Sequence, residues 1–307
     1  MSSNSSLNNL ILLIILSAIW GSAFISIKVS VEYIHPISVA SIRLIIAAIV
    51  LYIYFKSKNI VSSLSKKNIF LIFIIGLIGN FIPFTLISWS EIYLKSNTAG
   101  LLLSIAPIFA LVFSHFMTKD DKFTILKLFS ILIGFVGVLF IIGFDSFYNL
   151  NENKNLLIAK IAIIISALGY VLSSIFAYNL KEINSITLTT YVTISAAIIS
   201  LPFLILVEYN YSSNFNIKSI LPLIYLGVFP TAIAFLMRFY LIHKAGPIFL
   251  SYVAYLIPAF AIVWGYLFLN ETVTFNSIIG VILVLLGVLI SQKKLVTKKT
   301  NNSIYNQ

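Results

Sequence analysis

The stretch LLLSIAPIFALVF, residues 101–113, has a proline in the middle of a run that otherwise suits the interior of a helix. A second stretch, YVAYLIPAFAIVW at residues 252–264, repeats the arrangement, and its Pro258 follows Pro107 by 151 positions. A proline inside a helix removes an amide donor and crowds the carbonyl four residues earlier, which costs about 3 kcal/mol. Because this cost recurs at matched positions, we predict that the chain contains a repeated unit whose helix bends at the same point in both copies.

Further residues recur at nearly the same offset. Three pairs lie where a helix is expected to end or bend, and a glycine-valine pair recurs near the end of each half: Trp89 with Tyr240, Asn80 with Thr231, Asp120 with Glu271, and Gly137-Val138 with Gly287-Val288. Self-similarity at a fixed period indicates an internal repeat. We therefore predict one repeat over residues 1–148 and a second over residues 149–292, followed by a basic, disordered cytoplasmic tail at residues 293–307.

The composition is that of a membrane protein. Of the 307 residues, 60% are hydrophobic and only 9% are charged, so most of the chain cannot face water. The net charge of +11 comes from lysines in short patches between long apolar runs, which is typical of loops beside a membrane and argues against nucleic acid as a partner. The chain has no cysteine, which excludes disulfides and thiolate metal sites.

Ten apolar stretches have about the 20 residues that a helix needs to cross a bilayer. They cover residues 9–28, 36–55, 69–89, 97–117, 124–143, 156–178, 187–207, 219–242, 247–269 and 275–292. Each repeat holds five stretches, and because five is odd, the second repeat enters the membrane from the opposite side. The predicted fold is an all-α polytopic membrane protein with ten transmembrane helices in two inverted five-helix repeats.

The lysines predict the orientation of the chain. With the N-terminus inside, thirteen lysines fall on the inner side, and only five fall on the outer side: Lys28, Lys95, Lys154, Lys160 and Lys218. Cytoplasmic loops are richer in Lys and Arg than outer loops. We therefore expect both termini to be cytoplasmic.

Several segments together resemble the EamA-type transporters of the drug/metabolite transporter superfamily. They are AIWGSAFISIK at residues 18–28, the pattern from Pro36 to Arg43 followed by Ala47, SIAPIF at 104–109, YLIPAF at 255–260 and FLNETVT at 268–274. The resemblance covers residues 9–292. The chain departs from the family pattern at Ala23, where Asn is common, and at Asn270, where Gly is common; Ala23 removes a polar group that could have met a substrate.

The resemblance implies an alternating-access carrier of the inner (plasma) membrane, commonly an exporter of amino acids or related metabolites. It also implies a cavity between the halves, lined by the first, third, fourth, sixth, eighth and ninth helices. The expected partners are a small-molecule substrate and the lipid bilayer, with a homodimer left open, and no cofactor or metal is expected.

Three other functions fit the sequence less well. A carrier of nucleotide sugars or other phosphorylated metabolites would need several converging basic groups, and only two arginines lie within the apolar runs. A non-transporting structural subunit would leave the matched helix breaks without a purpose. The chain has no motif that pairs a nucleophile with a base or gathers metal ligands, so an enzyme is not expected.

Polar, aromatic and proline residues at membrane depth are the candidates for binding the substrate, because such groups usually face the interior of a bundle. These are Trp20, Ser22, Asn80, Trp89, Ser104, Pro107, Tyr170, Ser173, Thr231, Ser251, Tyr252, Tyr255 and Pro258. Tyr252 and Tyr255 lie three residues apart on one helical face, which predicts an aromatic and hydroxyl surface for a solute. For each Ser or Thr, the alternative is helix packing or a bond to its own backbone.

Three basic residues are expected to have structural or gating roles. Arg43 lies about 10 Å along its helix and is expected to bind backbone carbonyls or an acid such as Glu91 or Glu32. Arg238 is close enough to the inner end of its helix to snorkel as an anchor, and contact with a substrate carboxylate is the alternative. Lys28 is expected to be an anchor or a gate charge at the outer mouth.

No Asp or Glu lies near the middle of an expected span, and the three histidines also lie at helix ends. Proton relays across membranes usually use buried carboxylates or histidines. The sequence therefore predicts facilitated or exchange-type transport without a dedicated carboxylate relay.

Overall fold

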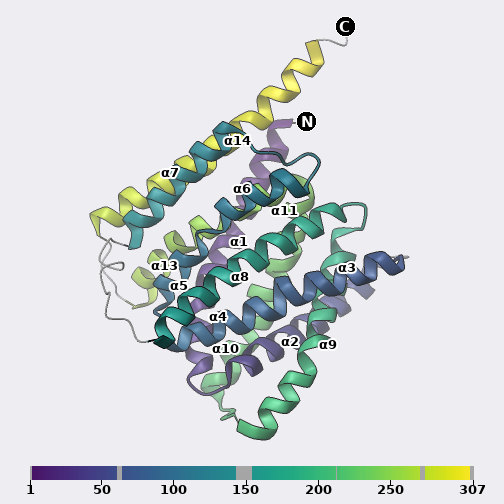
Figure 1. Ribbon diagram of the computed structural model, residues 1–307, viewed down its shortest axis with the longest axis vertical. Coiled ribbons are helices and arrows are strands. Elements are labelled where there is room, and N and C mark those ends of the chain that lie inside the picture. The colour runs from purple at the N-terminus through teal and green to yellow at the C-terminus, as the bar shows by residue number, and fades with distance from the viewer. Residues whose placement is uncertain (1, 61–63, 143–153, 212, 270–273, 305–307) are drawn as a thin grey trace.

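The computed structural model describes residues 2–60, 64–142, 154–211, 213–269 and 274–304, and in these ranges the regular secondary structure is helical throughout (Figure 1). The first half contains α1 (Ser2–Val31), α2 (Pro36–Ser57), α3 (Lys66–Gly76), the π-helical η1 (Leu77–Phe81), α4 (Ile82–Tyr93), α5 (Ser96–Leu103), α6 (Ala106–Met117) and α7 (Ile125–Ile142). The second half contains α8 (Lys154–Asn179), α9 (Ser185–Tyr211), α10 (Ile217–Leu226), the π-helical η3 (Gly227–Ile233), α11 (Ala234–Ala245), α12 (Pro247–Ser251), α13 (Val253–Leu269) and α14 (Phe275–Ile304). The expected repeat boundary at residues 148 and 149, Asn270 and Glu271 lie outside the described residues.

Eight helical segments of the described chain are long and apolar enough to cross a membrane. They are Leu7–Val31, Pro36–Ser57, Lys66–Tyr93, Thr98–Met117, Lys154–Asn179, Ser185–Tyr211, Ile217–Ala245 and Pro247–Trp264. Two shorter apolar helices, Ile125–Ile141 and Phe275–Ser291, coincide with the fifth and tenth predicted stretches. Large apolar side chains on the outer surface, such as Ile53 at 64% exposure, suit contact with lipid. The chain is thus a multi-pass membrane protein.

The two halves bend at equivalent places. The π-helical elements η1 and η3 begin 150 residues apart, at Leu77 and Gly227. Asn80 lies in η1 and Thr231 lies in η3, so the prediction that these two residues mark matching bends is confirmed. Single π-helical turns inside α-helices occur often at functional sites, because they redirect the side chains that follow.

The breaks beside the two prolines do not lie where the sequence predicts them. Ser104 and Ile105 separate α5 from α6, so Pro107 lies in the first turn of α6, where a missing N–H leaves no bond unmade. Pro258 does lie inside α13, but the break in that span comes earlier, at Tyr252, between α12 and α13. The prolines therefore mark equivalent spans without marking identical bends.

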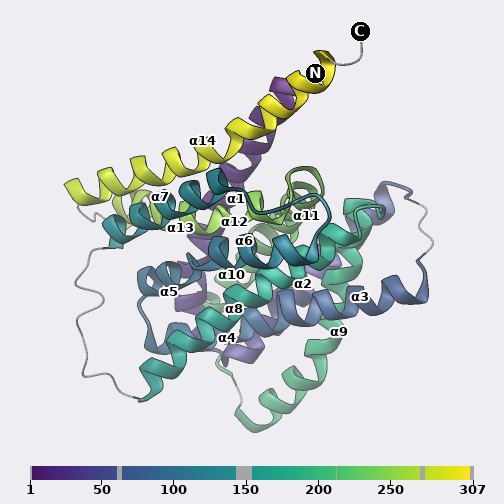
Figure 2. The same ribbon diagram turned by 45° about the horizontal axis from the view of Figure 1, so that its top comes forward.

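Helices α7 and α14 lie side by side along one flank of the molecule (Figures 1 and 2). A Cβ on Gly137 would lie 2.7 Å from the carbonyl oxygen of Gly280, and a Cβ on Gly287 would lie 2.6 Å from that of Ser130. Gly287 and Gly280 follow Gly137 and Ser130 by 150 residues. The same contact therefore occurs twice with the halves exchanged, which shows a two-fold relation between the repeats, and small residues let the helices approach this closely.

A second pair of glycine contacts shows the same relation. A Cβ on Gly76 would lie 2.9 Å from the carbonyl oxygen of Val192 on α9, and a Cβ on Gly227 would lie 3.2 Å from that of Arg43 on α2. Gly227 follows Gly76 by 151 residues, and Val192 follows Arg43 by 149. Each half thus packs its bent helix against the second helix of the other half.

The basic tail is helical where it was expected to be disordered. Helix α14 continues as far as Ile304. From Gly287 onward the tail contains no proline or further glycine, and its lysines and leucine have good helix propensity, so nothing in this segment stops the helix. The starts of α1 and the end of α14 lie at the same end of the molecule in both views (Figures 1 and 2).

Candidate functional site

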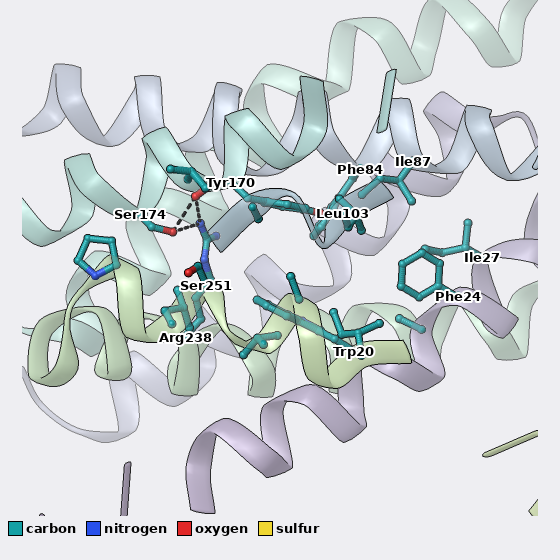
Figure 3. A pocket seen from close by; sticks show the side chains of 18 of the residues that line it. Trp20, Phe24, Ile27, Phe84, Ile87, Leu103, Tyr170, Ser174, Arg238 and Ser251 are labelled. Atoms are coloured by element: carbon teal, nitrogen blue, oxygen red, sulfur yellow. Dashed lines mark hydrogen bonds between the residues drawn. The ribbon is translucent and has the colours of Figure 1, made fainter. Parts of the chain in front are cut away.

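A cavity of about 110 Å³ lies between the two halves. Its wall comes from α1, α2, α4, α5, α6, α8, α11, α12 and α13 (Figure 3). All six predicted helices therefore contribute, and α2 joins them through Arg43, which the family resemblance did not imply. Pairs of wall residues are 151 positions apart, namely Ile87 with Arg238, Leu103 with Ala254 and Ala106 with Ile257. The cavity thus lies where equivalent parts of the repeats meet.

One end of the cavity is polar. Arg238, Ser174, Ser251 and the backbone of Tyr170 gather there (Figure 3). The Ser251 hydroxyl donates to the carbonyl of Ile248 at 2.7 Å, so it meets both its own helix and the cavity. This end can offer a guanidinium group and hydroxyl groups to a solute.

The other end of the cavity is apolar. Phe24, Ile27 and Ile87 lie on the side away from Arg238, and Leu103, Phe84 and Trp20 lie between the two ends (Figure 3). The Trp20 indole N–H donates to the carbonyl of Pro230 at 2.9 Å, so the polar atom of this wall residue is paired within the protein. The cavity wall is therefore apolar over most of its area, and its few polar groups gather at one end.

Arg238 is fixed inside the bundle by hydroxyl and carbonyl groups. Its side chain is 1% exposed, and its Nη2 donates to Ser173 Oγ at 2.6 Å and to Ser174 Oγ at 3.2 Å. Its Nη1 donates to Asn80 Oδ1 at 3.4 Å. The expectation that Arg238 snorkels as an interfacial anchor is therefore wrong, because neighbouring hydroxyls draw the guanidinium inward to the cavity wall.

Arg43 is buried in a different manner. Its Nε donates to Thr231 Oγ1 at 3.1 Å, and its guanidinium carbon lies 3.7 Å from the ring centre of Phe84. The expected acidic partners Glu91 and Glu32 do not bind it, because a hydroxyl and an aromatic face take their place. The ion pairs within the described residues join lysines to aspartates, and neither arginine takes part.

The two arginines are held across the boundary between the repeats. Arg43 of the first half binds Thr231 in η3, and Arg238 of the second half binds Asn80 in η1. Because Asn80 and Thr231 are equivalent residues, the π-helical bend of each half holds the arginine of the other half. A movement of one half against the other would therefore shift both guanidinium groups.

The predicted substrate-binding residues fall into three groups. Trp20, Tyr170 and Ser251 line the cavity. A second group does not line the cavity but binds the two arginines that do: Asn80, Ser173 and Thr231. The remaining predicted residues are not brought to the wall: Ser22, Trp89, Ser104, Pro107, Tyr252, Tyr255 and Pro258.

Tyr252 and Tyr255 turn away from the cavity. The Tyr252 hydroxyl lies 2.6 Å from Ser130 Oγ, and the Tyr255 hydroxyl donates to the carbonyl of Ile131 at 3.0 Å. Both partners belong to α7. The predicted aromatic and hydroxyl surface exists, but it ties α13 and its neighbouring turn to α7, and Gly134 leaves the space that the Tyr255 ring occupies.

Other polar candidates serve helix packing. Ser22 Oγ lies 2.5 Å from the Tyr225 hydroxyl, and Ser104 Oγ donates to the carbonyl of Leu101 at 2.5 Å. The Trp89 ring packs on Tyr93 with ring centres 5.1 Å apart. Bonds from Ser to its own backbone are the alternative that the sequence left open, and for Ser104 this alternative holds.

Sequence reasoning missed the apolar part of the wall. Phe24, Ile27, Phe84, Ile87 and Leu103 give no signal of their own, because the same residue types fill every helix interface of this protein. The repeat offset could have pointed to Ile87 and Leu103, since their equivalents are Arg238 and Ala254.

Asp121, in the loop between α6 and α7, binds the start of α12 beside the polar end of the cavity. Asp121 Oδ1 pairs with Lys127 Nζ at 2.6 Å, and Asp121 Oδ2 accepts the N–H of Ile248 at 2.9 Å. Ile248 follows Pro247, a wall residue, and the turn before it needs the positive φ of Gly246 at 90°.

In the same loop, the hydrogen bond from Lys181 lowers the pKa of Asp120. The described residues contain no group of His, Asp and Glu side chains that could hold a metal ion.

Lys28 is part of the opposite end of the bundle. Its Nζ donates to the carbonyl of Glu91 and, at 3.3 Å, to the carbonyl of Leu94. These carbonyls belong to the last turn of α4 and to the residue that follows it, where carbonyls lack helical partners. The ammonium group therefore joins the end of α1 to the end of α4, beside the apolar end of the cavity.

Comparison with known proteins agrees with this architecture. The EamA-like transporter family matches residues 8–143 and 153–292, one match for each half. "Uncharacterized transporter YoaV" of Bacillus subtilis (strain 168) is 24% identical over 277 residues, which cover 90% of this chain and 94% of the relative. An "Uncharacterized transporter" of Archaeoglobus fulgidus is 29% identical over 276 residues, which cover 90% and 95%. A solved crystal structure shares the fold, with a TM-score of 0.77 at 15% identity over 95% of this chain and 99% of that one. The family matches span both halves and the relatives span nearly the whole length: this chain belongs to the EamA-like transporter family.

Proposed function

We propose that the protein is an alternating-access carrier that exports amino acids or similar small polar metabolites across the inner membrane. One observation carries this proposal: the cavity wall holds two buried guanidinium groups, those of Arg43 and Arg238, without an acidic partner in the described part of the chain. A buried cation that lacks a counter-ion is costly. The carboxylate of a solute would supply the missing charge.

The size and shape of the cavity support a small solute. An apolar cavity of roughly 150 Å³ holds one benzene molecule, so a cavity of about 110 Å³ suits a small solute and would have to widen to enclose one as large as leucine. A carboxylate at Arg238 would place an apolar side chain between Trp20 and Phe24, at the other end (Figure 3). Small amphipathic amino acids have this shape.

The alternative substrates fit the same wall less well. A nucleotide sugar or another phosphorylated metabolite carries several negative charges and a body much larger than this cavity, and the wall offers two arginines. A structural subunit would have no use for a cavity with two buried arginines in its wall at the meeting point of two repeats. Transport of a small solute accounts for both features.

The topology that we propose has ten membrane passages with both termini in the cytoplasm. Eight segments support it by length and composition, and the two shorter helices α7 and α14 pack against each other through glycines. The termini lie at the same end of the molecule, as an even number of passages requires (Figure 2). Inverted repeats that meet at a central site are the usual architecture of alternating-access carriers.

Thiol protection tests the substrate class directly, because the chain has no cysteine of its own. Ser251→Cys places one thiol on the polar wall. Its rate of reaction with a small impermeant reagent is measured in vesicles with leucine, 4-methylpentanoate, isopentylamine or a nucleotide sugar. The first three share an apolar body and differ in their charged groups.

We expect leucine to slow the reaction at Ser251→Cys and isopentylamine to leave it unchanged, because leucine brings a carboxylate to Arg238 and isopentylamine has none. A matched Ser22→Cys variant lies outside the cavity wall and should show no protection by any compound. Protection by the nucleotide sugar alone, or by none of the compounds, would contradict the proposed substrate class.

A further inference from the structure

Glu91, near the end of α4, is a buried acid that the proposed transport cycle has not yet used. Its side chain is 0% exposed. One carboxyl oxygen, Oε2, accepts the hydroxyl of Ser96 at 2.7 Å. The other oxygen, Oε1, is buried and has no hydrogen-bond partner in the structure. An ionised carboxylate with an unpartnered oxygen is strongly disfavoured away from water, whereas a protonated carboxyl group loses much less there.

The charged neighbours of Glu91 leave this imbalance in place. Lys28 of α1 attracts the carboxyl group, but its ammonium donates to the backbone carbonyls of Glu91 and Leu94 and forms no ion pair with the side chain. Of the other elements packed against α4, α2 places Arg43 on the ring of Phe84. Phe84 lies two helical turns before Glu91 on α4. The start of α5 carries the exposed Lys95, and α8 carries Lys160, which follows the carbonyl that accepts the Ser90 hydroxyl.

The position of Glu91 links it to the cavity. Ile87 lines the apolar end and lies four residues before Glu91 on the same face of α4, and Ile27 lines it directly before Lys28. Separation of α1 from α4 at this end would open the cavity and bring water to the carboxyl group in one movement. In the proposed topology this is the outer end.

We propose that Glu91 is a proton-binding site whose protonation closes the outer end of the cavity. On closure, one proton from the outer water forms an O–H bond with the Glu91 carboxylate, and the neutral group is buried. On opening, the same O–H bond breaks and the proton returns to that water. This inference rests on the proposed alternating-access cycle in one respect: the outer end of the cavity must open during the cycle.

The test measures opening without any substrate. Ala23→Cys places a thiol on the cavity wall, and a small impermeant thiol reagent is added from the outside of right-side-out vesicles at pH 6, 7 and 8. The exposed Lys218→Cys, at the start of α10, corrects for the intrinsic pH dependence of a thiol. The result is the ratio of the two labelling rates.

In the wild-type background the ratio should rise between three- and tenfold per pH unit in the range where the single proton is released. Glu91→Gln, a neutral mimic of the protonated acid, should hold the ratio at its pH 6 value throughout. Ser96→Ala removes the hydroxyl that stabilises the charged form, so it should move the rise to higher pH. The second variant keeps the test valid if Glu91→Gln folds poorly.

A ratio that does not change with pH, or an unchanged pH dependence in Glu91→Gln or Ser96→Ala, would overturn the proton site while leaving the carrier proposal intact. Absence of labelling at Ala23→Cys from either side at every pH would overturn both, because the cavity would then never open.

Discussion

Ile87 and Arg238 occupy equivalent places in the two halves, and both line the cavity. Ile87 forms part of the apolar end, whereas Arg238 forms the core of the polar end (Figure 3). The glycines that set the distance between helices show the opposite behaviour, because Gly137 and Gly287 make the same contact in both halves. These glycines are thus alike in the two repeats, whereas Ile87 and Arg238, which line the cavity, differ.

The same division holds beyond the cavity wall. Arg43 is equivalent to Val192 on α9, and Glu91, at the offset of 151, is equivalent to Ile242 on α11. Each charged group therefore occurs in one half only, although the backbone around it occurs in both. A symmetric scaffold carries an asymmetric set of charges, and this asymmetry places Arg238 at one end of the cavity and apolar side chains at the other.

Arg238→Ile would make the two halves equal at the cavity wall and should have the largest effect. It removes the charged donor for a carboxylate, and hydrogen bonds to charged groups contribute about 1.5–3 kcal/mol, so transport should fall by about 10- to 100-fold. The measurement is leucine efflux from loaded proteoliposomes. Ile87→Val, at the equivalent position, should retain most of the activity. Normal transport by a folded Arg238→Ile protein would show that this arginine is structural.

Gly137→Ala and Gly287→Ala test the symmetric part of the comparison. Each new Cβ would lie within 3 Å of a backbone oxygen of the facing helix, and overpacking of this kind costs about 1–3 kcal/mol. Thermal unfolding in detergent should show a similar loss of Tm for the two variants, about 2–4 °C per kcal/mol. Gly100→Ala is the control, because its Cβ would lie 3.9 Å from Pro258. A large loss in one variant and none in the other would refute the two-fold packing.

The repeat, the helical spans and the family could be predicted from the sequence, because they depend on periodicity and on motifs that recur. The direction of each side chain could not. Tyr252 and Tyr255 share a helical face as predicted, but the helix that covers this face is α7, and its position depends on the glycine contact with α14.

The role of the arginines was also beyond the sequence. The depth of Arg238 along its helix allows both snorkelling and burial, and the choice is made by Ser173 and Asn80 from distant parts of the chain. Glu91 shows the same limit: the sequence offered it as a partner for Arg43, whereas the packing around α4 buries it fully beside Ser96. Local pattern fixes where a charge enters the bundle, and tertiary packing decides whether it meets water.

The smallest predicted effect concerns two equivalent helix caps. The His35 Nδ1 accepts the N–H of Ile37 at 3.3 Å before α2, and the Asn184 Oδ1 accepts the N–H of Ile186 at 2.9 Å before α9. Burial lowers the pKa of His35 below 6.5, although Glu208 acts in the opposite direction. The unfolded chain therefore binds a proton more readily, so this contribution to stability is complete above pH 6.5 and is lost as the pH falls through the lowered pKa.

Exchange of the cap residues of α2 and α9 separates the effect of His35 protonation on stability from the effects of other titrating groups. A protonated imidazole cannot accept the N–H of Ile37, and loss of an N-cap costs about 1 kcal/mol, so acidification from pH 8 to pH 5 should lower the Tm by roughly 2–4 °C through this site. His35→Asn should remove that part of the pH dependence, because Asn accepts the same N–H at every pH. Asn184→His should introduce a similar dependence before α9. If His35→Asn left the profile unchanged, the acid sensitivity would belong to other groups, and the two caps would be equivalent in energy as well as in position.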